Sequence, residues 1–187
     1  MDLERLRYLA ALMAIVKSPE EAISSDQIRK IVDELISEGE FSDEFVEILE
    51  SRPPLLRDVL EPFKHYLRGK GIEVSDREQA VWIALRYRIA RIASRQAPVA
   101  EELERLINDV YTNYDFYGQT KKVVGDSHDA NPFFAAHFNL DDLKSSSTEE
   151  RKKAQYRQEI EAFAVNAAKD WIKKHGNVGA LSGREHK

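Results

Sequence analysis

The chain contains no cysteine among its 187 residues. This absence excludes disulfide bonds and thiolate metal sites, and it argues against a small secreted scaffold, which usually needs such bonds. No apolar run approaches the roughly 20 residues that a membrane-spanning helix requires. The short apolar run near the N-terminus is followed by no small-residue cleavage site, so an amphipathic helix is expected there rather than a signal peptide. The sequence therefore predicts a cytoplasmic protein that has no membrane partner.

The sequence also has no alternating strand pattern of useful length, and the segment 121–125 is the one candidate for a strand. Helix signals recur instead, with apolar residues repeating every three or four positions. Four capping boxes, in which Ser is followed three residues later by Glu or Gln, start at Ser18, Ser24, Ser75 and Ser147. Helices are expected over 2–17, 24–39, 42–49, 55–68, 76–96, 98–110 and 147–176. The sequence thus predicts an all-α fold, an irregular bundle of about six to eight helices.

The same patterns bound the domain organisation. A chain of this length fits one domain, which is expected to cover residues 1–176, with a flexible tail over 177–187. In the last helix, apolar residues repeat at steps of four, three, four and four, a stripe typical of a core-facing side. The stripe consists of Tyr156, Ile160, Phe163, Ala167 and Trp171.

The formal net charge is −5 and the sequence pI is near 5.6, so no nucleic-acid partner is expected. The charge alternates along the chain: 1–63 and 99–143 are acidic, whereas 64–98 and 144–187 are basic. Such blocks suit pairing between helices of the chain, and they equally suit a partner of complementary charge. The acidic balance favours a protein partner with a basic surface, and a homo-oligomer stays open.

Arginines form a row on the expected helix 76–96. At 100° per residue, Arg77, Arg88, Arg91 and Arg95 fall within about 60° of one another. Guanidinium groups match both phosphates and carboxylates, so Arg88, Arg91 and Arg95 are a candidate row for an anion or a carboxylate-rich partner. The other interpretation is pairing within the chain, either with the acidic N-terminal helices or with Glu101, Glu102 and Glu104.

The segment 111–143 breaks the helical pattern and is rich in aromatic residues, which a solvated linker has little reason to hold. We therefore expect an ordered loop over 111–147, of the kind that usually carries function. Tyrosine is enriched at protein interfaces, so a partner-binding surface is predicted at its start. Its residues are Tyr111, Tyr114, Asp115, Phe116 and Tyr117. The alternative is a plug of buried rings, expected at Phe133 or Phe134.

Histidine and carboxylate side chains in this segment, namely His128, Asp129, His137 and Asp141, give an alternative metal site. His137 and Asp141 would share one face of a helical turn. The doublet His128-Asp129 resembles that of the HD phosphohydrolases, an all-α family in which an upstream His and a downstream Asp complete the site. The resemblance implies those roles for His65 and Asp170. In that family the doublet ends an apolar helix, whereas Gly125-Asp126-Ser127 precedes it here.

The preferred interpretation is a non-catalytic helical protein that needs no cofactor and binds another protein. An inhibitor, an adaptor or an immunity-like or antitoxin-like regulator would fit this size and charge. The alternative is a metal-dependent phosphoester hydrolase centred on His128, Asp129 and His137.

Overall fold

The protein is described by a computed structural model that covers residues 2–16, 18, 23–73, 76–119 and 121–176. Glu21 of the capping box expected at Ser18, Ser75 of the box expected there, and the tail over 177–187 fall outside the described residues. Within those ranges every regular element is helical: eight α-helices, one π-helical turn and one 3-10 turn. The all-α prediction is therefore confirmed. None of the described helices is both long and apolar enough to cross a membrane.

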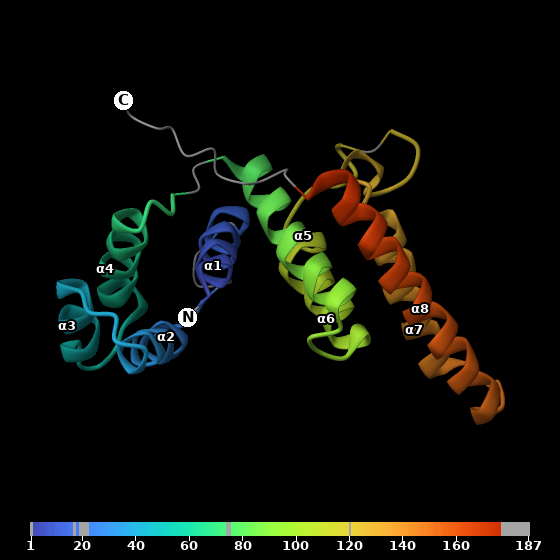
Figure 1. Cartoon of the computed structure of the whole chain (residues 1–187), viewed down its shortest axis with the longest axis horizontal. Coiled ribbons are helices and arrows are strands. Elements are labelled where there is room, and N and C mark those ends of the chain that lie inside the picture. The colour runs from blue at the N-terminus through green and yellow to red at the C-terminus, as the bar shows by residue number, and fades with distance from the viewer. Residues whose placement is uncertain (1, 17, 19–22, 74–75, 120, 177–187) are drawn as a thin grey trace. The chain divides into compact units, whose positions relative to one another are not determined.

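The chain divides into two compact units, residues 1–81 and residues 82–187, and the division falls within one helix (Figure 1). The single domain expected over 1–176 stays a prediction. Unit 1 holds four helices and the first turn of a fifth: α1 (Leu3–Ile15), α2 (Ser25–Ser37), α3 (Asp43–Glu50), α4 (Leu56–Gly69) and α5 (Arg77–Ser94). Unit 2 continues α5 and adds α6 (Val99–Leu106), a π-helical turn (Ile107–Tyr111), a 3-10 turn (Asp126–His128), α7 (Asn131–Ser145) and α8 (Glu150–His175).

Local sequence signals account for the helix ends in unit 1. The Ser24 hydroxyl accepts from the backbone N–H of Gln27, whose side chain accepts from the N–H of Ser24, so this capping box is confirmed. α2 ends before Gly39, which adopts a positive φ of 86° that other residues disfavour. α4 packs against α1, α2 and α3, and its Pro62 lies inside the helix. Their apolar faces meet in one core, which includes Ile28, Val32, Phe45, Val59, Phe63 and Leu67.

Unit 2 contains an antiparallel pair of helices, α7 and α8, which pack against one another (Figure 1). The connection over 146–149 is short, which makes the two helices neighbours. Small residues of α8 form its buried face: Ala164, Val165 and Ala168. α6 packs against both α7 and α8.

Two expectations for this part of the chain are wrong. The loop expected over 111–147 includes α7, because Asn131-Pro132 begins a helix with Pro in its first turn and apolar residues follow at helical spacing. The loop proper is confined to 112–125. The expected cap at Ser147 is also not formed, since α8 begins at Glu150 with Glu149 as its N-cap residue.

The apolar stripe of α8 is core at one end only. Trp171 is buried as expected, whereas Tyr156 is 46% and Phe163 55% exposed. The stripe was expected to face the core along its whole length, and for these two rings that prediction is wrong. The buried face of α8 is rotated toward its alanines, which leaves an apolar side of the helix in contact with solvent.

Candidate functional site

The loop 112–125 is fixed at its end by Asp126. The Asp126 carboxylate accepts hydrogen bonds from the backbone N–H groups of Lys121, Lys122 and Val123. These bonds, led by the one from Lys121, hold the pKa of Asp126 below its usual range. Gly125, at a φ of 83°, brings the backbone close to the ring of Phe134. The segment 121–126 is therefore a capped turn rather than an open linker.

His128 lies in an aromatic box and exposes 1% of its surface. Its ring centroid is 4.7 Å from that of Trp82, 5.4 Å from Phe116 and 5.7 Å from Tyr114. Its Nδ1 lies 2.8 Å from the Ser127 hydroxyl. The indole N–H of Trp171 donates to the His128 carbonyl over 2.9 Å, which ties the loop to α8. His128 is thus a packed residue that solvent does not reach.

Asp129, unlike the neighbouring His128, binds charged side chains of the last turn of α8. Its carboxylate lies 2.5 Å from the Lys174 ammonium and 2.7 Å from His175 Nε2. The hydrogen bond from Lys174, then that from His175, keeps the pKa of Asp129 below its usual value. Asp129 itself adopts a left-handed backbone conformation, with φ at 52°. The doublet His128-Asp129 therefore divides between the core and a surface ion pair.

His137 and Asp141 lie one turn apart on α7, as the sequence predicts. Burial lowers the pKa of His137, and the Asp141 carboxylate opposes this shift only in part. Asp141 accepts from Lys144 over 2.9 Å. The structure does not bring His137 to His128 and Asp129, and the described residues contain no group of three or more His, Asp or Glu placed to hold a metal ion. His65, which the resemblance would add, is bonded instead to Glu44 in unit 1.

The residues of the predicted partner-binding surface divide between core and solvent. Phe116 is 1% exposed and packs against Phe134 at 5.1 Å, so its assignment to a surface is corrected. Tyr114 is half-buried against Phe116. Tyr117 is 70% exposed, and its hydroxyl lies 3.3 Å from that of Tyr111. Only part of the predicted surface can therefore meet a partner.

Phe138 lies beside these exposed rings. The sequence did not assign this residue to the site. It is 44% exposed, and its ring lies 5.8 Å from the ring of Tyr111. The hydrogen bond with Tyr117, together with burial, raises the pKa of Tyr111 above its usual value. Tyr111, Tyr117 and Phe138 form what we call the outer aromatic cluster.

Charged side chains of both signs lie near the outer aromatic cluster. Phe138 packs on His137, and the charges of Asp141, Lys144 and Glu104 all act on that imidazole. Asp115 is exposed two residues before Tyr117, and its carboxylate accepts from the backbone N–H of Gly118 over 2.9 Å. Because Lys144 pairs with Asp141, the carboxylates near the rings that lie outside this ion pair are Asp115 and Glu104.

Internal carboxylates bind two of the three candidate row arginines. Arg88 donates to Glu102 over 3.0 Å and to Asp109 over 2.7 Å, and Arg91 donates to Glu102 over 2.9 Å. Glu102 is completely buried. Arg95 lies beyond the end of α5, with φ at 52°. The row is thus interrupted, and its central members hold α5 to α6 and to the π-helical turn.

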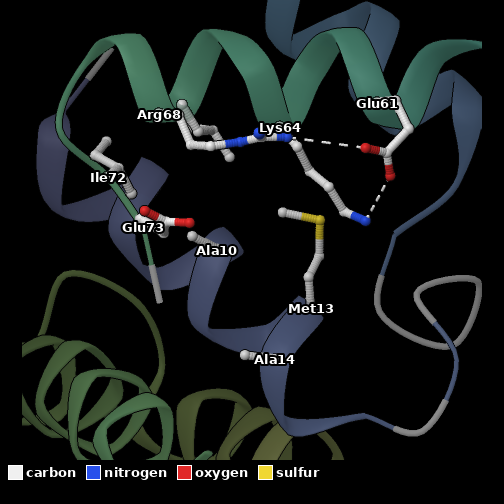
Figure 2. Close-up of a pocket in the computed structure, with 9 residues that line it drawn as sticks. Ala10, Met13, Ala14, Glu61, Lys64, Arg68, Ile72 and Glu73 are labelled. Atoms are coloured by element: carbon white, nitrogen blue, oxygen red, sulfur yellow. Dashed lines mark hydrogen bonds and ion pairs between the residues drawn. The ribbon is translucent and has the colours of Figure 1, made fainter. Parts of the chain in front are cut away.

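A groove of about 360 Å³ lies in unit 1 between α1 and α4 (Figure 2). Met13 and the alanines of α1 form an apolar wall, and Lys64 and Arg68 project from α4. Both cations are held by Glu61 of the same helix, Lys64 at 2.8 Å and Arg68 at 3.9 Å. With Glu73 on the opposite wall, the groove carries as many carboxylates as cations. Its charge therefore favours no class of ligand.

Comparison with known proteins gives no match: no family model, no curated protein and no solved structure matches this chain. The function is accordingly argued from the geometry alone.

Replacing Gly125 with Ala tests the packing of the loop. The new Cβ would lie 2.6 Å from Cε2 of Phe134 and 3.1 Å from the Asn131 nitrogen, at a φ that L-residues disfavour. We expect the free energy of unfolding to fall by about 2–3 kcal/mol. Gly71→Ala is the control, because its φ is also positive but its Cβ would meet nothing within 4 Å. Equal losses for the two variants in urea denaturation would show that Gly125 is not tightly packed.

Proposed function

We propose that the protein binds another protein through the outer aromatic cluster, in an inhibitor, adaptor or immunity-like role. The observation that carries this proposal is the exposure of Tyr117 and Phe138 on an ordered frame. The Tyr117 hydroxyl lies within hydrogen-bond distance of the Tyr111 hydroxyl, and the Phe138 ring packs against the Tyr111 ring, so both contacts limit the freedom of the rings before a partner binds. Rigid exposed aromatic rings lose little conformational freedom on binding, which is why they dominate the energetics of many interfaces.

The charge around the cluster supports a partner with a basic surface. Asp115 and Glu104 are exposed carboxylates near the three rings, whereas Asp141 is paired with Lys144. Exposed charges mainly raise the rate of encounter and are screened by salt. An association that weakens as ionic strength rises is therefore part of the proposal.

The proposal is tested by affinity capture from the native host with three forms of the full chain. We expect the wild type and Phe41→Ala to retain the same protein, because Phe41 is 76% exposed but lies in unit 1, far along the sequence from the cluster. The double variant Tyr117→Ala, Phe138→Ala should lose it. Titration of the purified pair should show at least about 30-fold weaker binding for the double variant, as for a hot spot of about 2 kcal/mol.

Undiminished binding by the folded double variant would exclude this surface. The acidic side chains of α3, Asp43, Glu44 and Glu47, would then be the next candidate contact. Equal loss with Phe41→Ala would instead point to nonspecific capture by exposed rings.

A further inference from the structure

A seam runs along a side of α8 that the described residues of unit 2 leave exposed. At 100° per residue its members fall within about 80° of one another, next to the buried alanine face. Tyr156 and Phe163 are about half exposed, Ile160 and Ala167 are partly exposed, and the charged residues at the two ends are exposed. The α8 seam consists, in chain order, of Lys152, Tyr156, Ile160, Phe163, Ala167 and Asp170.

The α8 seam is self-complementary about a point between Ile160 and Phe163. If a second copy of the seam lies alongside the first in the reverse direction, the cation of each copy faces the carboxylate of the other. A large ring of each copy then faces the small methyl group of an alanine in the other. Two antiparallel copies would thus place Lys152 opposite Asp170 of the partner subunit. Tyr156 would face Ala167 of the partner subunit, and Ile160 would face Phe163 of the partner subunit. Each contact occurs twice, as a two-fold axis requires.

A hollow beside the seam can accommodate a large ring of the partner subunit. It measures about 480 Å³ and is lined by Pro132 of α7 together with Phe163, Ala167 and Trp171 of α8. In the antiparallel arrangement, Tyr156 of the partner subunit arrives opposite Ala167, at this hollow. Large residues packed opposite small ones interdigitate well, which is the condition for a close helix contact.

The opposite orientation is disfavoured by charge. Parallel helices in register would bring Lys152 against its own copy and Asp170 against its own copy, and like charges facing each other repel. It would also bring two exposed rings together at Phe163 while leaving Ala167 opposite Ala167. Of the two orientations, only the antiparallel one both pairs opposite charges and places large side chains opposite small ones.

We infer that two copies of this chain associate as a two-fold homodimer through antiparallel α8 seams. This contact is separate from the outer aromatic cluster, and it stands or falls independently of the proposed protein partner. α8 has 26 residues and is therefore about 39 Å long. One helix face of that length buries less area than a standard stable interface, so the dimer belongs to the weak class that forms at high protein concentration.

Sedimentation equilibrium of the full chain, up to submillimolar concentration, tests the association. The wild type should show a monomer–dimer equilibrium, and Phe163→Glu should be monomeric throughout. Ala162→Glu is the matched control, because it places the same charge on the next residue of the helix, exposed but facing away from the seam. Circular dichroism should show both variants to be as helical as the wild type.

A charge exchange tests the register and does not depend on the Phe163 variant folding. Lys152→Asp and Asp170→Lys should each raise the dissociation constant by about tenfold, through lost attraction and new repulsion. The double variant should recover the wild-type value, since each cation would again face a carboxylate. Lys169→Asp, on another side of α8, should change nothing.

Spin labels distinguish the orientation, and the chain has no native cysteine to interfere. Labels on Lys173→Cys should lie about 35 Å apart along the axis in an antiparallel dimer, because each is 11.5 residues from the centre. Labels on Ala162→Cys should lie side by side. The inference is overturned by a wild type that stays monomeric, by a Phe163→Glu dimer as strong as the wild type, or by a short distance at 173.

Discussion

Glu102→Ala should lower the free energy of unfolding by about 3–5 kcal/mol, because it removes the central anion of a buried network. The Glu102 carboxylate is fully buried and accepts from Arg88 and Arg91, and Arg105 also reaches it at 3.4 Å. Without it, Arg88 loses one of the two carboxylates that hold its almost buried guanidinium, and Asp109 remains. Chemical denaturation of the full chain measures the change.

Glu101→Ala is the matched control, since Glu101 is exposed on the same helix and touches only Arg105, at 3.7 Å. Exposed ion pairs contribute little, so we expect a change within about 0.5 kcal/mol. Glu102→Gln should fall between the two, because it keeps a hydrogen-bond acceptor without the charge. If Glu101 and Glu102 proved equally sensitive, the network would not be what joins α5 to α6.

Phe116→Ala should cost about 3–5 kcal/mol of folding stability, through lost burial and the cavity that remains. The Phe116 ring packs on Tyr111, Tyr114, His128 and Phe134, so its removal opens the centre of the cluster around His128. Loss of near-ultraviolet circular dichroism should accompany the loss of stability.

Tyr117→Ala, one residue along the chain, is the control and should leave folding nearly unchanged, since the Tyr117 ring is mostly in solvent. Tyr114→Ala should fall between them, because that ring is half-buried against Phe116. A negligible cost for Phe116→Ala would mean that the loop 112–125 is not packed as described.

Much of the fold follows from local signals in the sequence. The Ser24 capping box, the stop at Gly39 and the apolar periods of α4 and α5 act within one or two turns, so they can be recognised without tertiary contacts. The sequence did not predict α7, because Asn131-Pro132 is equally typical of a turn and of the start of a helix. The pattern after it, with Phe133, Ala136 and Leu140 buried, was the available sign of a helix.

The site was less predictable from the sequence, because tertiary packing decides which of its residues are buried and which are exposed. Phe116 and Tyr117 are adjacent and chemically similar, yet one is core and the other is exposed. Nothing local distinguishes them; the difference comes from Phe134 and His128, which α7 and the 3-10 turn bring to Phe116. For the arginine row the sequence offered Glu102 as one possible partner, whereas Asp109 is brought to Arg88 by the π-helical turn and was not expected.

The position of the two tryptophans makes the protein its own optical probe. Trp82 and Trp171 are the only ones in the sequence, and both belong to unit 2, with ring centroids 6.0 Å apart. Indole fluorescence therefore reports on unit 2 alone, whereas far-ultraviolet circular dichroism sums the helices of both units. Melting curves recorded by the two signals will coincide if the chain unfolds as one cooperative body, and will separate if each unit melts on its own.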